Sequence, residues 1–166
     1  MICQTLAPAL RLSLKWPNDL LAGSRKLGGL LLESETQDEG LAIVIGFGLN
    51  LASAPEGMPF PTTSLLEFGY RALPEQALTL LSDAWSRLEE VWRRDGFAEI
   101  RRRWLARAAC VGEAISIVTG DRLEAGIFET LDEQGRLILR RPDGDVRAVS
   151  AGDVFFGDVA TAGAAS

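Results

Sequence analysis

Three short segments in the first third of the chain combine residue types that could bind and activate a phosphorylated ligand. They are Lys15 to Asp19 (KWPND), Lys26 to Leu30 (KLGGL) and Gly46 to Asn50 (GFGLN). Lysine side chains supply positive charge for phosphate oxygens, and glycines let the backbone itself approach a ligand. A site that holds a phosphate and a flat polar ring together needs both, so the segments predict binding of such a ligand.

Lys26 is the residue that we expect to take part in the chemistry. When negative charge develops at a phosphate during a reaction, a fixed ammonium stabilises that transition state more than the ground state. The alternative is that Lys26 is a solvated hairpin residue beside Arg25, as most lysines next to turns are. Composition alone favours this alternative, whereas the neighbouring motifs favour a catalytic lysine.

The two adjacent glycines and Asn50 each allow two interpretations. Gly28 and Gly29 could mark a bulge or close strand packing, or a place where the backbone passes against a ligand ring. Asn50 is an amide in an apolar strand and needs partners when buried, which a nucleotide edge or a neighbouring backbone group could supply. The pair Gly46 and Gly48 is no dinucleotide fingerprint, because no helix is expected after it.

Trp16 and the arginine-rich region also have simpler explanations. Trp16 could pack in a core while Asn18 and Asp19 form their own turn. The run 101–103, with other nearby arginines, could attract a phosphate or an acidic carrier surface, but such runs are usually solvated helix faces. The apolar stripe that contains Trp85 and Trp92 is expected to be core.

The spacing of apolar residues, glycines and prolines predicts the elements that must position these residues. Alternating leucines predict a strand, Pro17 disfavours helix at the residue before it, and Pro74 suits the first turn of a helix. A mostly antiparallel sheet is expected before that helix. The expected elements are a strand over 9–14, a tight bend at KWPND, a hairpin over 20–33, a strand over 41–51, a short helix over 62–68, a helix from Pro74 closed by Gly96, and a second helix over 97–109.

Beyond Gly112 the pattern changes to short strands joined by tight turns, which is typical of a small barrel. A domain boundary is expected near residue 111, with the barrel over 112–157 and a disordered tail over 158–166. The expected strands of this barrel are 113–119, 123–132, 136–140 and 146–149.

Composition excludes several classes of site. The 166 residues contain no histidine, which removes histidine bases, imidazole triads and the common zinc sites. A net charge of −6 argues against general nucleic-acid binding. Cys3 and Cys110 form no metal or redox motif and are expected to be ordinary thiols. No apolar run is long enough to span a bilayer and no secretory signal is visible, so a cytoplasmic location without membrane association is expected.

The three motifs, in this order and with short gaps, resemble the biotin protein ligases, and the resemblance extends from about Leu10 to Phe156. It implies an α+β fold: part of the mixed sheet and helices of a catalytic domain related to class II aminoacyl-tRNA synthetases, then a small C-terminal β-barrel of the Src-homology-3 type. Residues 1–111 would be the C-terminal portion of that catalytic domain. The implied reaction forms biotinyl-adenylate from biotin and Mg-ATP and transfers biotin to a lysine of a biotin carrier domain, as in acetyl-CoA carboxylase.

The resemblance also implies roles for individual residues. Lys26 would contact the biotin carboxyl group and the adenylate phosphate, Gly28 and Gly29 would border biotin, and Asn50 would lie near the nucleotide. The substrates ATP, Mg²⁺ and biotin are implied, with no permanently bound cofactor and no protein metal site. A homodimer is left open, and no nucleic-acid partner is implied. The remaining residues expected to shape the binding pocket are Lys15, Trp16, Asn18, Asp19 and Leu30.

One part of the family pattern is not found. The ligases carry a Gly/Arg-rich adenylate-binding loop of the form GRGRxGRxW well before KWPND, and nothing before Lys15 matches it. We therefore expect an N-terminally truncated chain that is inactive or weak by itself, through a misassigned start or because the gene is a remnant. Two other functions remain open: a lipoate or octanoate ligase of the same superfamily, and a non-catalytic module that binds a carrier domain.

Overall fold

The computed structural model describes residues 5–37 and 40–156. Contacts divide the chain into two compact units, one of Met1–Leu14 and Asn18–Arg87 and one of Lys15–Pro17 and Leu88–Ser166. This division falls inside a helix and inside the KWPND motif, whereas the boundary near residue 111 was predicted from the change in strand pattern. Cys3 and the predicted tail over 158–166 lie outside the described residues.

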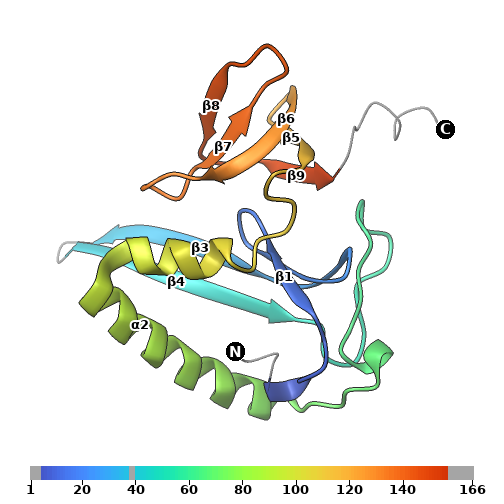
Figure 1. Cartoon of the computed structure of the whole chain (residues 1–166). Coiled ribbons are helices and arrows are strands. Elements are labelled where there is room, and N and C mark those ends of the chain that lie inside the picture. The colour runs from blue at the N-terminus through green and yellow to red at the C-terminus, as the bar shows by residue number, and fades with distance from the viewer. Residues whose placement is uncertain (1–4, 38–39, 157–166) are drawn as a thin grey trace. The chain divides into compact units, whose positions relative to one another are not determined.

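The first unit contains a sheet with the strand order β1-β2-β3-β4 (Figure 1). Strands β2 and β3 form the predicted hairpin, and β3 pairs with β4 in antiparallel register. KWPND leaves β1 as the predicted bend, because residues 16–18 form a turn between β1 and β2. The strands are β1 (Leu12–Lys15), β2 (Asp19–Ala22), β3 (Arg25–Gln37) and β4 (Gly40–Leu49).

The core of the first unit is built around the β2–β3 hairpin. Ala22 and Leu27 from the hairpin are buried together with Ala7 and Leu65. Residues 53–63 form an irregular loop, and only the 3₁₀ turn η1 (Leu66–Phe68) is found in the region where a short helix was expected. The buried side chains therefore fix the start of β3, which carries Lys26.

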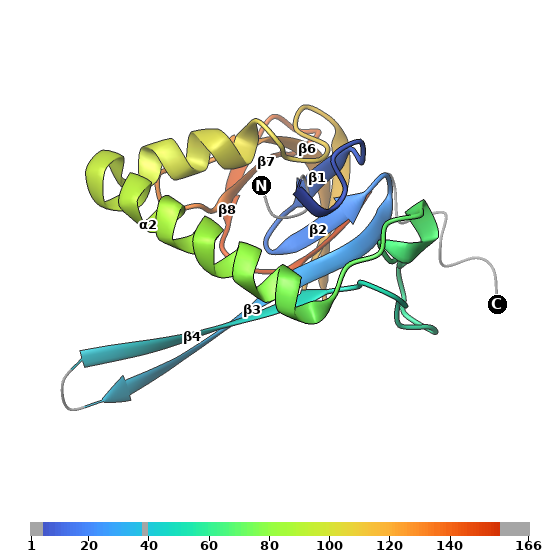
Figure 2. The same ribbon diagram turned by 90° about the horizontal axis from the view of Figure 1, so that it is seen from below.

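The far part of the β3–β4 hairpin exposes an apolar face. Figure 2 shows these two strands running beyond β1 and β2 as a two-stranded ribbon. Residues directly opposite each other in antiparallel strands share a face, and here Leu32 lies opposite Ile45 and Ser34 opposite Ile43. All three apolar side chains of these pairs are exposed. The ribbon therefore contributes little burial to the stability of the unit.

Replacing Ile43 by threonine is expected to change the free energy of unfolding by less than about 0.5 kcal/mol, since its side chain is 56% exposed. The matched change Ile115→Thr places a hydroxyl in the core at a residue that is 1% exposed and should cost at least about 1 kcal/mol more. Urea denaturation followed by circular dichroism measures both. Equal losses at the two positions would show that the ribbon is covered in solution.

Helix α2 (Pro74–Leu105) contains both helices that were predicted separately. Gly96 interrupts it with φ 72° and ψ −174°, a left-handed φ that favours glycine, so the predicted break is confirmed. The expectation that the apolar stripe is core is wrong for the described chain, because Trp85 and Trp92 are exposed and the buried helix residues are Ala77 and Ala84. Helical spacing identifies a stripe but does not show that anything packs against it.

The second unit contains a five-stranded sheet in the order β8-β7-β6-β5-β9, and each of its strand pairs is antiparallel. Its buried core includes Ile115, Phe128, Leu137 and Leu139. Burial raises the pKa of the Cys110 thiol to about 11, which agrees with an ordinary, unreactive cysteine. The strands are β5 (Ala114–Thr119), β6 (Arg122–Leu131), β7 (Leu137–Arg140), β8 (Val146–Val149) and β9 (Asp153–Phe156).

Four of these strands were predicted, and β9 was not. Among the described residues, no helix is long and apolar enough to cross a membrane.

Candidate active site

Lys26 and Asp19 form an ion pair at the start of the β2–β3 hairpin. The Lys26 Nζ atom lies 2.5 Å from Asp19 Oδ1, and the two side chains are 29% and 12% exposed. The strand register shifts by one residue between Leu20 and Leu21, so that Gly29 lies opposite Asp19. Such a bulge re-aims side chains locally and is common next to active sites. The hairpin thus presents a fixed, partly exposed ammonium group.

The irregular loop that follows Asn50 holds the backbone of Lys26. The Lys26 N–H donates to the Pro61 carbonyl at 2.8 Å, and the Lys26 carbonyl accepts from the Thr63 N–H at 2.9 Å. The Phe60 ring lies beneath the ammonium, with 5.0 Å between Lys26 Nζ and the ring centroid, a distance at which the ring attracts the cation. Both the main chain and the side chain of Lys26 are therefore held in place.

Asn18 and Leu30 join the motif turn to β3. The Asn18 side-chain amide donates to the Leu30 carbonyl, and the Leu30 N–H donates to the Asn18 carbonyl at 2.9 Å. Asn18 thus fixes the strand segment just beyond Gly29, and the Leu30 side chain is partly exposed there. These contacts bring together Asn18, Asp19, Lys26 and Gly29, four residues that form what we call the Lys26 cluster.

The two adjacent glycines have different surroundings. A Cβ atom on Gly28 would lie 2.4 Å from the Gly48 carbonyl oxygen, so Gly28 is required for the close approach of β3 and β4. A Cβ atom on Gly29 would lie 3.2 Å from Asp19 Oδ1 and 3.4 Å from Lys26 Cε. Gly29 therefore lies directly against the ion pair, where any side chain would crowd both Asp19 and Lys26.

Asn50 connects the site to the loop rather than lining an open surface. Its side-chain Nδ2 donates to the Thr63 carbonyl at 2.9 Å and lies 3.5 Å from the Lys26 carbonyl. Its backbone N–H donates to Leu27 and its carbonyl accepts from Leu65. The Asn50 amide therefore has a backbone partner, which was one of its two possible kinds of partner. A contact between Asn50 and a nucleotide stays a prediction.

Replacing Asn50 by alanine should lower the free energy of unfolding by about 1 kcal/mol, because it removes the Thr63 hydrogen bond. Urea denaturation measures this loss. The control is Ser86→Ala, which removes an exposed hydroxyl whose hydrogen bond stays within one helix turn, and it should be close to neutral. An unchanged stability in Asn50→Ala would show that the amide does not hold the loop.

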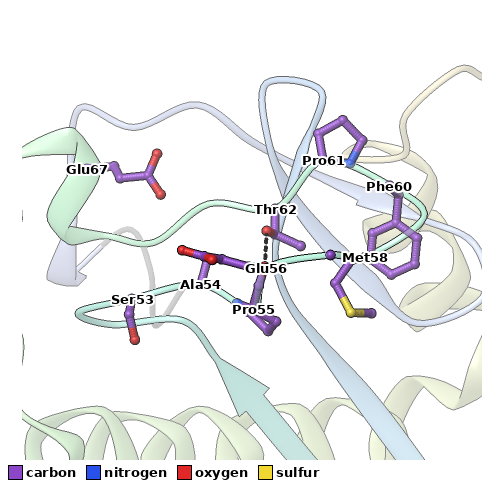
Figure 3. A pocket seen from close by; sticks show the side chains of 10 residues that line it. Ser53, Ala54, Pro55, Glu56, Met58, Phe60, Pro61, Thr62 and Glu67 are labelled. Atoms are coloured by element: carbon purple, nitrogen blue, oxygen red, sulfur yellow. Dashed lines mark hydrogen bonds between the residues drawn. The ribbon is translucent and has the colours of Figure 1, made fainter.

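A pocket of about 510 Å³ lies in the same loop (Figure 3). In the figure Glu67 lies at one side of it, and Met58 and Phe60 lie at the other. The Thr62 hydroxyl bridges the loop by donating to the Pro55 carbonyl at 2.7 Å. A hydrogen bond from Arg25 holds the pKa of Glu67 below its usual value.

The sequence interpretation did not include these loop residues. Phe60, which contacts Lys26 and lines the pocket, is the strongest of them. In the sequence, Phe60 stands out only as an aromatic residue within the proline-rich loop that follows GFGLN. Loop conformation decides whether such a residue turns toward the site, and a pattern of residue types does not specify it.

Lys15 and Trp16 belong to the second compact unit. Trp16 is 5% exposed and packs in the core of the C-terminal sheet. Lys15 Nζ lies 6.0 and 5.9 Å from the ring centroids of Phe155 and Phe156. Both residues therefore belong to a different compact unit from Lys26, and their place in the binding pocket stays a prediction.

Two family models match the chain: the biotin/lipoate A/B protein ligase family over residues 8–50, and the biotin protein ligase C-terminal domain over residues 111–157. The chain is 44% identical over 157 residues to a biotin–acetyl-CoA-carboxylase ligase from Paracoccus denitrificans, which covers 90% of this chain and 65% of the relative. The chain belongs to the biotin protein ligase family. The first of the two matches contains every residue of the Lys26 cluster.

Other biotin protein ligases agree with this assignment. A ligase from Mycobacterium tuberculosis is 36% identical over 151 residues, with 89% of this chain and 54% of the relative covered. The apo structure of the Aquifex aeolicus biotin protein ligase superimposes with a TM-score of 0.79 over 94% of this chain and 70% of that chain, at 21% identity. The predicted fold class is therefore confirmed as that of the biotin protein ligases.

The chain spans only part of these biotin protein ligases. It covers 65% of the Paracoccus relative and 54% of the Mycobacterium relative. Membership of the family therefore does not by itself assign the activity of a whole ligase to this chain.

Proposed function

We propose that the Lys26 cluster is part of a site that activates biotin with ATP and passes it to a carrier lysine. The observation that carries this proposal is the Lys26 ammonium, which is held by Asp19 and by the loop and has Gly29 beside the ion pair. Its position lies within the match to the biotin/lipoate ligase family. One of the similar solved structures, from Aquifex aeolicus, is described as a complex with biotin and ATP.

In the first step, a carboxylate oxygen of biotin attacks the α-phosphorus of ATP. The new P–O bond gives biotinyl-adenylate, and the bond to the leaving pyrophosphate breaks with its electron pair on pyrophosphate. Negative charge grows on the oxygens of the α-phosphate in the transition state. An ammonium already fixed beside them stabilises this charge without having to reorganise, which is the role proposed for Lys26.

In the second step, the uncharged ε-amine of a carrier lysine attacks the acyl carbon of the adenylate. The C–N bond forms, AMP leaves with the electron pair of the C–O bond, and the nitrogen loses a proton to give an amide. Asn18, Asp19, Gly28, Gly29, Leu30 and Asn50 are proposed to shape or support the pocket. The burial of Trp16 instead suggests a supporting role for the KWP segment.

Magnesium is proposed to enter with the phosphates of ATP. The described residues contain no group of three or more His, Cys, Asp or Glu side chains that could hold a metal ion. Mg²⁺ in nucleotide sites is bound largely by phosphate oxygens and water with one or two carboxylates. A site for the Mg-ATP complex is therefore compatible with the residues present.

The proposed acceptor is the biotin carrier domain of a biotin-dependent carboxylase, because the Paracoccus and Mycobacterium relatives are named for acetyl-CoA carboxylase. A cytoplasmic location and a homodimer remain predictions. We also propose that this chain is inactive or weak by itself, since it spans 65% or less of the length of these two ligases.

A lipoate or octanoate ligase is the second candidate, because one family model covers biotin and lipoate ligases together. The match of residues 111–157 to a biotin protein ligase C-terminal domain favours biotin. A third candidate is a non-catalytic module that binds a carrier domain.

Transfer of labelled biotin, lipoate or octanoate to a carrier domain with Mg-ATP tests these alternatives. The chain is compared with a version that adds the further length present in the relatives, and reactions without ATP serve as controls. Biotin transfer that needs ATP supports the proposal, and a preference for lipoate or octanoate supports the second candidate. Carrier binding that neither ATP nor biotin changes, without transfer by either form, would favour the third.

A further inference from the structure

Two groups of different chemistry hold the Lys26 ammonium. The Asp19 carboxylate lies 2.5 Å from Lys26 Nζ, and the centroid of the Phe60 ring lies 5.0 Å from the same atom. Asp19, Lys26 and Phe60 all belong to the first compact unit. The carboxylate attracts the ammonium by its full negative charge, whereas the ring attracts it by the negative face of an uncharged π-system. A bound anion therefore affects the two contacts differently.

The loop fixes the place of the Phe60 ring relative to Lys26. Pro61, the next residue, accepts a hydrogen bond from the Lys26 N–H at 2.8 Å, and Thr62 forms a parallel β-bridge with Lys26. The Thr62 hydroxyl closes the loop by donating to the Pro55 carbonyl at 2.7 Å. Phe60 thus stands directly before a segment that pairs with the main chain of Lys26, so one hydrogen-bonded frame carries both the ring and the ammonium.

An anionic ligand at Lys26 competes with Asp19. Phosphate oxygens repel the Asp19 carboxylate and attract the same ammonium. A lysine side chain that loses its charged partner regains rotamer freedom, and fixing it again costs free energy. The Phe60 ring carries no net charge, and the N–H donors of an ammonium can turn toward an oxygen while the cation stays over the ring. A phosphate at Lys26 is therefore compatible with the ring contact, although it weakens the contact with Asp19.

We propose that Phe60 is a positioning residue that keeps the Lys26 ammonium in place when a phosphate oxygen replaces Asp19 as its charged partner. Asp19 holds the ammonium before a ligand binds, and the Phe60 ring holds it in both states. The catalytic meaning of this inference rests on the proposed function, whereas the hold of the ring on the ammonium does not require any ligand. Phe60 acts through Lys26 and needs no contact with the reacting atoms.

The test uses the scarcity of lysine in this chain. Lys15 and Lys26 are its only lysines, so the protein grown with ¹³C-lysine gives two side-chain Cε signals, which Lys15→Arg and Lys26→Arg assign. Relaxation of the Lys26 signal reports how firmly the side chain is held. Asp19→Asn imitates the loss of the charged partner without any ligand.

In Asp19→Asn, we expect the order parameter of Lys26 Cε to stay clearly above that of lysine in an unfolded peptide, because the ring still holds the ammonium. Adding Phe60→Leu should lower it to the unfolded-peptide value, and adding Phe60→Tyr, which keeps the aromatic face, should not. Met58→Leu is the matched control, since Met58 lies on the same side of the loop pocket as Phe60 (Figure 3). In the Asp19→Asn background it should leave the Lys26 signal unchanged.

Two results would overturn the inference. One is a Lys26 order parameter that already has the unfolded-peptide value in Asp19→Asn, and the other is an equal value with and without the Phe60 ring in that background. Circular dichroism verifies that each variant is folded. If Phe60→Leu does not fold, Phe60→Met replaces it, because methionine also fills irregular space without an aromatic face.

Failure of the proposed function is seen separately, as absence of biotin transfer by the parent and extended forms. Where biotin-dependent exchange of pyrophosphate into ATP is measurable, Phe60→Leu should lower its rate by about two- to fivefold, the effect of losing one cation–π contact at a partly exposed site. Phe60→Tyr should restore most of the rate. Equal rates for Phe60→Leu and the parent would also contradict the inference.

Discussion

Replacing Lys26 by methionine is expected to slow formation of biotinyl-adenylate by about 10²- to 10³-fold, the usual effect of removing one fixed group that stabilises transition-state charge. Methionine keeps the length and apolar character of the side chain but not the positive charge. The ammonium is held by Asp19 at 2.5 Å and lies 5.0 Å from the centroid of the Phe60 ring, so the substitution removes a positive charge of fixed position. Biotin-dependent exchange of pyrophosphate into ATP measures the step without a carrier.

The matched control is Arg25→Met at the preceding residue. Arg25 pairs with Glu67 at 2.5 Å on a half-exposed surface, and its loss should change the rate by no more than about twofold. The assay uses whichever form, the chain or its extended version, shows measurable exchange. Equal rates for the parent and Lys26→Met would remove Lys26 from the mechanism, and equal losses for both variants would point to a general loss of positive charge.

Replacing Gly28 by alanine is expected to destabilise the protein by about 3 kcal/mol or more, at the upper end of the cost of overpacking. The added Cβ atom would lie 2.4 Å from the Gly48 carbonyl oxygen, and this contact is with backbone that cannot rotate away. Strands β3 and β4 would have to separate where the hairpin joins the core. The midpoint and slope of urea denaturation measure the loss.

Gly46→Ala is the control, because a Cβ atom there would lie 3.6 Å from its nearest neighbour, an ordinary contact. Gly29→Ala should be tolerated better than Gly28→Ala, since its closest neighbour at 3.2 Å is the side-chain oxygen of Asp19. Gly29→Ala should instead weaken ligand binding beside Lys26. A stable Gly28→Ala protein would mean that Gly28 serves a ligand rather than the sheet.

Local sequence patterns predicted much of the fold. The hairpin turn at 22–25, the strand before Asn50 and the break at Gly96 each depend on neighbouring residues, and all are present. Strand β9 was not predicted, because it has only four residues and is followed by a stretch of small residues. A segment this short shows little periodicity. Its pairing with β5 joins Phe156 to Ile115, a contact that local pattern cannot indicate.

The candidate site was predictable where the residues are close in sequence. Asp19, Lys26 and Gly29 meet because a hairpin brings its two strands together. The partners of Trp16 were not predictable, since Gly135, whose carbonyl accepts a hydrogen bond from the Trp16 indole N–H, lies more than a hundred residues away and no spacing rule links the two. The sequence also could not show why glycine is needed at position 28 and at position 29. The reason differs between the two, because it depends on which residues lie opposite each glycine in the sheet.

The way in which both lysines are held also affects where an activated acyl group can go. An acyl adenylate that escapes its site reacts with any uncharged primary amine that it meets. This chain has 2 lysines among its 17 basic residues, and one pairs with Asp19 while the other lies against Phe155 and Phe156. In the proposed reaction, biotinyl-adenylate therefore meets few lysine side chains on this chain. Acylation of these lysines should be slight compared with acylation of the carrier lysine.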